Sequence, residues 1–248
     1  TVADLRQDAL SDGALSIDEA TRLALLSNPR LLAMLQELDI ARGDLIEATL
    51  PANPVLDAEA RFKEGGQGEI IEFAVAQNVL GLLFLPRRRQ VAEARLEASK
   101  AEATGVLIDL VAAVRTAYRD LQAELELTTL FRTALDTAYY SYDLSKRLRD
   151  AGNVIELNVL NDQVLFEEMK LSLVRSQASV AQERENLNML LGLSGEDADS
   201  WEVKPRVPQA QSFELDGAQV ERDAITASLD LIKQTYELEA LGHEVGLH

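Results

Sequence analysis

The feature that most constrains the fold is a stretch of more than 60 residues, from Pro86 to about Arg149, in which no further proline occurs and Gly105 is the single glycine. At ~1.5 Å of rise per residue, it predicts a helical rod on the order of 90 Å long. Its apolar residues recur at steps of four and three, the spacing of a coiled-coil seam: Leu107, Val111, Val114, Tyr118, Leu121 and Leu125, then Leu135, Tyr139 and Tyr142. We therefore expect this rod to pack along another helix.

A return helix is predicted directly after the rod. Ala151-Gly152-Asn153 ends the rod, because glycine and asparagine accept the left-handed conformation that terminates helices. The return helix should run from about Ile155 to Leu191, and the stripe expected to face the rod comprises Leu157, Leu160, Val164, Leu171, Val174, Ala178 and Ala181. The two helices would form an antiparallel hairpin.

A β-hairpin is predicted before the rod. After Pro51-Ala52-Asn53-Pro54 the pattern changes to period two, with apolar residues alternating with charged ones from Leu56 to Lys63. A second run places large apolar residues opposite smaller or polar ones: Ile71, Phe73 and Val75 against Glu72, Ala74, Ala76 and Asn78. The turn between them is Glu64-Gly65-Gly66-Gln67-Gly68. The length suits tilted strands of a transmembrane barrel, and it equally suits a surface hairpin packed on the helices.

The first and last helical segments resemble each other. Ser16 and Glu19 fit a capping box, and Asn28-Pro29 starts a second helix that should run to Thr49. The segment from Ala24 to Leu31 is echoed by Ala224 to Leu231, at a spacing of roughly 200 residues that suggests a duplicated half-molecule. We expect the chain to hold one complete repeat and the start of another, as part of a longer protein.

Composition excludes several classes of function. The net charge of −18 argues against nucleic-acid binding, since Arg87-Arg88-Arg89 is the sole dense basic run, and that run fits a membrane boundary or a solvated helix start. The absence of cysteine excludes disulfides and thiolate metal sites. Two histidines near the C-terminus, His243 and His248, are expected at the surface, and three methionines, Met34, Met169 and Met189, are expected to pack in cores. We therefore predict no catalytic residues, no metal site and no cofactor.

The order of these segments predicts five parts of a mainly α-helical protein. They are N-terminal helices (1–50), the β-hairpin (51–85), the long helical hairpin (86–193), a linker (194–214) and the first helix of a second repeat (215–248). Within the linker, Trp201 is expected to anchor the segment against the rods.

Together these elements resemble the TolC-like outer-membrane efflux protein family. The elements that carry the resemblance are Ser16-Ile17-Asp18-Glu19-Ala20, Asn28-Pro29-Arg30-Leu31, Leu50-Pro51-Ala52-Asn53-Pro54, Gln77-Asn78-Val79-Leu80, Leu157-Asn158-Val159-Leu160 and Leu187-Asn188-Met189-Leu190-Leu191-Gly192-Leu193. Their order and spacing are more specific than any one of them. The chain departs from the family at Asn158, where aspartate is usual, and in carrying no second hairpin or second rod.

The resemblance implies half of an α-barrel and β-barrel protomer in a homotrimeric channel. The hairpin would contact outer-membrane lipid, and the helices would extend into the periplasm of a Gram-negative cell. An inner-membrane pump and a periplasmic adaptor would deliver drugs or metal ions, which the channel conducts passively. The alternative is a non-membrane coiled-coil scaffold or an adaptor, although an adaptor should also show glycine-rich lipoyl-like segments, which this chain lacks. An enzyme is not expected.

The resemblance also points to a site at the tip of the helical hairpin. Arg147, Arg149, Asp150, Gly152 and Asn153 would lie at the periplasmic mouth, where the adaptor docks and neighbouring helices close the pore. The alternative is an ordinary solvated turn.

Overall fold

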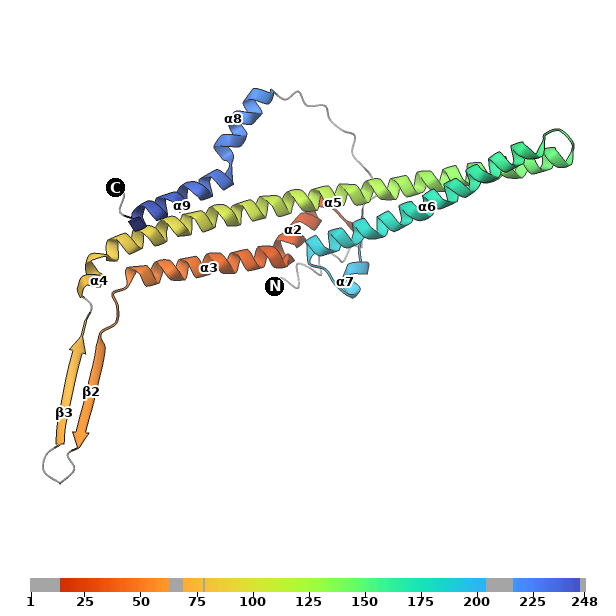
Figure 1. The fold of residues 1–248 in the computed structure, drawn as a ribbon. Helices are drawn as coiled ribbons and strands as arrows, with labels where there is room; N and C mark the ends of the chain where they lie inside the picture. The colour runs from red at the N-terminus through yellow and green to blue at the C-terminus, as the bar shows by residue number, and fades with distance from the viewer. Residues whose placement is uncertain (1–13, 63–68, 78, 204–215, 246–248) are drawn as a thin grey trace. The chain divides into compact units, whose positions relative to one another are not determined.

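The computed structural model describes residues 14–62, 69–77, 79–203 and 216–245. The chain divides into two compact units, one of residues 1–32 and 107–214 and the other of residues 33–106 and 215–248. The turn Glu64 to Gly68, the basic segment Lys204 to Pro208 and His248 lie outside the described residues. Figure 1 gives the order of the elements, which are mainly helical as predicted.

The first unit contains the predicted antiparallel helical hairpin. Helix α5 (Leu85–Asp150) enters it at residue 107, and α6 (Glu156–Leu191) returns alongside it (Figure 1). Contacts along its length fix the direction: the Thr128 and Ser176 hydroxyls are 2.7 Å apart, the Tyr139 and Phe166 rings 5.7 Å apart, and at the tip Arg149 pairs with α6. The hairpin and its coiled-coil packing are thus confirmed.

The predicted seam on α6 is wrong. Leu157, Leu160, Val164, Leu171 and Val174 are 48–58% exposed, and Ala178 and Ala181 are also exposed. The residues buried on α6 are Val159, Ser176, Leu187, Asn188 and Leu191. The seam includes polar side chains because they find partners across it: Ser176 meets Thr128, and Asp162 accepts a hydrogen bond from Ser145. The helix has two stripes at helical spacing, and the more apolar one faces outward.

The seam predicted on α5 is correct over its middle. Val114, Tyr118 and Leu121 are at most 2% exposed, whereas Leu107 is 41% exposed and Tyr139 is 50% exposed. Burial is therefore concentrated where the N-terminal segment and the end of α6 also pack.

Helix α2 (Ile17–Ser27) is capped at its start and joined at its end to α6. The capping box is formed: the Ser16 amide donates to Glu19 Oε2 at 2.7 Å and the Glu19 amide to Ser16 Oγ at 3.3 Å. Ser27 Oγ donates to the Leu191 carbonyl at 2.7 Å. At Gly192, which has φ +66°, an added Cβ would lie 2.3 Å from the Ser27 carbonyl oxygen, so only glycine fits between the two helix ends.

Residues 194–214, predicted as a linker, contain two short elements. Helix α7 spans Glu196–Asp199, and strand β4 (Glu202–Val203) pairs in parallel with β1 (Ala14–Leu15). Trp201 is 1% exposed and donates its indole N–H to Asn188 Oδ1 at 3.0 Å, which confirms its role as an anchor. The Tyr118 hydroxyl donates to the Leu15 carbonyl at 2.8 Å and ties the small sheet to α5.

In the second unit, the first part of α5 packs with two further helices. Helix α3 (Pro29–Thr49) ends at the predicted residue. Helix α9 (Leu229–Val245) follows α8 (Gly217–Ala227), and Lys233 Nζ lies 2.9 Å from Glu102 of α5. The break at Ser228 repeats the break at Asn28 and α8 has the same length, 11 residues, as α2, which agrees with the repeat seen in the sequence. His243, expected at the surface, is half-buried.

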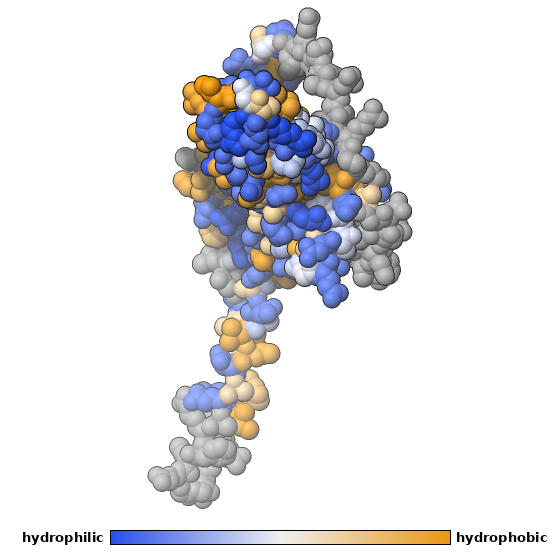
Figure 2. Space-filling model, turned by 90° about the vertical axis from the view of Figure 1, so that its right-hand side faces the viewer, coloured by the Kyte–Doolittle hydropathy of each residue, from blue (hydrophilic) through white to orange (hydrophobic). Residues whose placement is uncertain are grey.

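The β-hairpin has the predicted alternation. Strands β2 (Val55–Phe62) and β3 (Glu69–Ala76) are antiparallel, and Leu56 pairs with Val75 and Ala58 with Phe73, so these four side chains share one face. Phe73 is 80% exposed and Leu56 76%, and Figure 2 shows such apolar side chains uncovered along the hairpin. Helix α4 (Val79–Leu83) links the hairpin to α5. In the described part of the chain, no helix combines the length and the apolar character needed to cross a membrane.

Candidate functional site at the tip of the helical hairpin

The turn between α5 and α6 is a glycine-terminated helix end. Gly152 has φ +74°, its amide donates to the Arg149 carbonyl at 2.8 Å, and the Asn153 amide donates to the Leu148 carbonyl at 2.8 Å. This pair of backbone bonds is the Schellman arrangement, which satisfies the last carbonyls of a helix. Gly152 and Asn153 therefore shape the turn, and nothing lies within 4 Å of the place where a Cβ on Gly152 would be.

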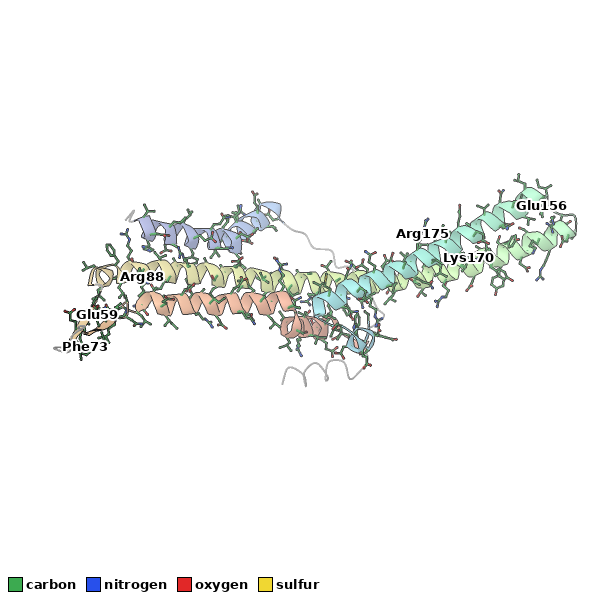
Figure 3. All side chains as sticks on the ribbon, turned by 60° about the horizontal axis from the view of Figure 1, so that its bottom comes forward. Glu59, Phe73, Arg88, Glu156, Lys170 and Arg175 are labelled. Atoms are coloured by element: carbon green, nitrogen blue, oxygen red, sulfur yellow. The ribbon has the colours of Figure 1, made fainter. Side chains whose placement is uncertain are left out.

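Arg149 links the two helices across this turn. Its guanidinium donates to Asp150 Oδ1 at 2.8 Å and to Glu156 Oε2 at 3.0 Å, the latter on the first turn of α6. The hydrogen bond that Arg149 donates to Asp150, followed by the one that it donates to Glu156, raises the pKa of Arg149 above its ordinary value. Figure 3 shows Glu156 at this end of the hairpin, with Lys170 and Arg175 farther along α6.

The other predicted site residue, Arg147, is separate from this group. It pairs with Asp143 one turn back along α5, at 2.7 Å, and is 76% exposed. The structure therefore brings together Arg149, Asp150 and Glu156 above the turn formed by Gly152 and Asn153. Sequence reasoning missed Glu156, although an acidic residue in the first turn of a helix is a recognisable signal.

An aromatic group near the tip was also missed. The Tyr142 and Phe166 rings stack at 6.1 Å, Tyr139 packs at 5.7 Å from both Phe166 and Tyr140, and Tyr140 is 69% exposed. The Lys146 ammonium lies 5.3 Å from the Tyr142 ring centroid. The run Tyr139-Tyr140-Ser141-Tyr142 was the signal in the sequence. The tip thus offers exposed rings and charges, the residue types that favour protein contacts.

The described residues give no sign of a metal centre. They contain no group of three or more histidine, aspartate or glutamate side chains placed to hold a metal ion. Met34 is buried as expected, but Met189 is 69% exposed, so the prediction of core packing is wrong for Met189.

Comparisons with solved structures show the same fold in bacterial channels. A membrane protein from Pseudomonas aeruginosa is 21% identical, with a TM-score of 0.74, and the match covers 93% of this chain and 56% of the other. The CmeC outer membrane channel of Campylobacter jejuni is 14% identical, with a TM-score of 0.76, and the match covers 93% of this chain and 52% of the channel. The outer membrane protein VceC of Vibrio cholerae is 15% identical, with a TM-score of 0.75, and the match covers 93% of this chain and 57% of VceC. The chain spans little more than half the length of these structures.

Comparison with sequences gives a family but no individual relative. No curated protein matches the chain. The profile of the family described as "Outer membrane efflux protein" matches residues 20–193, which include most of α2 and all of α3, the β-hairpin and the helical hairpin. The chain belongs to the outer membrane efflux protein family, whose members are non-enzymatic transport proteins of the Gram-negative outer membrane.

Proposed function

We propose that the protein is a subunit of a homotrimeric efflux channel. Its β-hairpin contacts outer-membrane lipid, and its helical hairpin forms part of a periplasmic tunnel. Drugs or metal ions enter from an inner-membrane pump through a periplasmic adaptor and pass to the exterior without chemical change.

The observation that carries this proposal is the uncovered apolar stripe of α6. Leu157, Val164 and Val174 lie on the face opposite the α5 seam and are 56–58% exposed. At about 25 cal/mol per Å² of apolar surface, such a stripe favours burial against further helices, as in a tube of many helices. The exposed apolar face of the β-hairpin supports the same proposal, and disfavours a scaffold that works in water alone.

We further propose that the hairpin tip is where the adaptor docks and where the tunnel narrows. The group Arg149, Asp150 and Glu156 exposes carboxylates at 60–66% on the last turn of the hairpin. Helices that converge there bring such charges within a few ångströms of neighbours, where a like-charge contact costs on the order of 1–4 kcal/mol.

Charge reversals in the full-length protein test this proposal. Arg149→Glu and Asp150→Lys should change drug or metal tolerance in cells at equal protein abundance. The matched controls, Lys170→Glu and Glu97→Lys, reverse charges that lie along the helices in exposed ion pairs, where screening is strong. If tip and control variants show equal drug or metal tolerance, the tip is an ordinary solvated turn and the proposal for the tip is contradicted.

A further inference from the structure

A cavity of about 500 Å³ lies in the second unit between α3, the start of α5 and the end of α9. Its size falls within the ~300–1,000 Å³ typical of small-molecule sites. The lining follows helical spacing on α3 and α5 and comprises Ala41, Asp44, Glu47, Ala48, Phe84, Arg87, Arg88, Val91, Ala92, Arg95 and Glu244.

Three of the charged side chains that line the cavity, two negative and one positive, have no partner among the described residues. The carboxylates of Asp44 and Glu47 and the guanidinium of Arg88 make no hydrogen bond or ion pair with any residue that the structure describes. By contrast, Arg87 donates its Nε–H to the His243 carbonyl, and Arg95 lies 3.2 Å from Glu244. The free carboxylates come from α3 and the free guanidinium, labelled in Figure 3, from α5.

Apolar side chains continue from the cavity toward the β-hairpin. Phe84 lines the cavity and is 56% exposed, and Leu83, on α4, is 74% exposed. The chain then leads directly from α4 to the exposed strand β3. Charged groups beside an apolar surface match the boundary between lipid headgroups and acyl chains.

We propose that this cavity binds the headgroup of a phosphatidylethanolamine molecule. Arg88 donates to the phosphate, the geometry that guanidinium groups favour, and the primary ammonium donates to Asp44 and Glu47. Phe84 packs against the glycerol and the start of an acyl chain. The proposal rests on the proposed function, because that function places this end of the molecule at the membrane.

The two carboxylates select among lipids. A headgroup with only a negative charge would meet Asp44 and Glu47 without a compensating cation, which disfavours phosphatidylglycerol. Phosphatidylcholine carries the same phosphate, but its quaternary ammonium has no N–H to donate. The ethanolamine headgroup is thus the one that satisfies both sets of charges.

Native mass spectrometry of the full-length protein in detergent tests the site, with the three lipids supplied at equal concentration and matched acyl chains. Wild type should retain phosphatidylethanolamine about tenfold more than either competitor, a difference of ~1.4 kcal/mol. The double variant Asp44→Asn, Glu47→Gln should lose the preference over phosphatidylcholine. Arg88→Gln should weaken retention of phosphatidylethanolamine and of phosphatidylcholine.

Two control variants keep the charge changes but leave the cavity intact. Asp39→Asn acts on the same helix as Asp44, at a carboxylate that pairs with Arg42. Arg89→Gln acts next to Arg88, at a guanidinium that pairs with Glu93 and does not line the cavity. Both should keep the wild-type preference. Equal retention of the three lipids by wild type, or an unchanged preference in the double variant, would overturn the proposal.

Glycerophosphoethanolamine separates a lipid from a soluble zwitterion. It should compete at least tenfold more weakly than the lipid, since it cannot contact Phe84 through an acyl chain; equal competition would overturn the lipid assignment. Membrane flotation and drug tolerance, measured in parallel, keep the two proposals distinguishable. If the protein floats with membranes and supports efflux but shows no lipid preference, only the proposed lipid site is contradicted. If the protein does not float with membranes, the proposed function itself is contradicted.

Discussion

Gly152 and Gly192 both end a long helix in the left-handed conformation, but their surroundings differ. A side chain on Gly152 would meet nothing within 4 Å, whereas one on Gly192 would meet the Ser27 carbonyl at 2.3 Å. Gly105 lies inside α5 with open space around it. The same substitution therefore tests three different physical effects.

Replacing each glycine by alanine should change stability in a predictable order. Gly105→Ala should raise the free energy of unfolding by about 0.5–1 kcal/mol, because alanine is the better helix former. Gly152→Ala should lower it by about 1–2 kcal/mol through backbone strain. Gly192→Ala should lower it by a further 1–3 kcal/mol or so, because the carbonyl must move. Urea unfolding followed by circular dichroism measures all three, and a Gly192→Ala effect no larger than that of Gly152→Ala would contradict the packing argument.

The sequence pattern predicted the turn at the tip of the helical hairpin but not the ion pairs there. Ala151-Gly152-Asn153 is a local signal, because the left-handed conformation depends on those residues alone. The contact of Arg149 with Glu156 depends on how the turn aims two helices, which no local pattern records. The cavity beside Arg88 was equally hidden, because it needs α3 and α9 to lie against α5.

At the scale of elements, the two faces of the helical hairpin should respond differently to truncation. Leu121 is 1% exposed, and Leu121→Ala should cost roughly 2–5 kcal/mol of stability. Val174 is 57% exposed on α6, and Val174→Ala should cost less than ~0.5 kcal/mol in the 248-residue chain. Thermal unfolding of the two variants gives the comparison. A large loss for Val174→Ala would mean that its stripe is buried in solution.

The attachment of α9 to α5 should depend on pH through Lys233. The hydrogen bond that Lys233 donates to Glu102 raises the pKa of Lys233 above its ordinary value of 10.5. A group with a raised pKa in the folded state stabilises the fold below the unfolded pKa, and this contribution is lost as pH rises through the folded pKa. The difference in melting temperature between wild type and Lys233→Met should therefore be present at about pH 8 and shrink above about pH 10.5. An equal difference at both values would contradict this.

The sequence predicted the bounds of the helices better than it predicted which face of each helix is buried. Proline and glycine positions set where α3 begins and where α5 and α6 end, since these residues act on the local backbone. The face that α6 turns toward α5 could not be read from hydrophobicity, because the buried Ser176 and the half-buried Asp162 have partners on α5. Leu157, Leu160 and Leu171 are exposed instead. The two-residue strands β1 and β4 were missed because so short a segment has no periodicity.

At the scale of the whole molecule, the 248-residue chain alone should not form a pore. In the hairpin, β2 and β3 form a two-stranded sheet with two open edges, and a membrane-spanning barrel needs every edge paired. Planar-bilayer recordings of the purified chain should show no stable unit conductance. Discrete, reproducible channels would contradict this expectation.

The junction of α2 with the end of α6 has a consequence for the order of events in folding. The hydrogen bond between Ser27 and Leu191 closes a loop of 164 residues, whereas the helical hairpin forms between neighbours in sequence. Closing a long loop lowers the entropy of the chain before the contacts that stabilise it have formed, so contacts between distant residues form late. Pulsed hydrogen exchange during refolding should therefore protect amides of α5 and α6 before those of α2. Until residue 192 has left the ribosome or the export machinery, the first helix has no place to dock, and it reaches its folded position among the last parts of the unit.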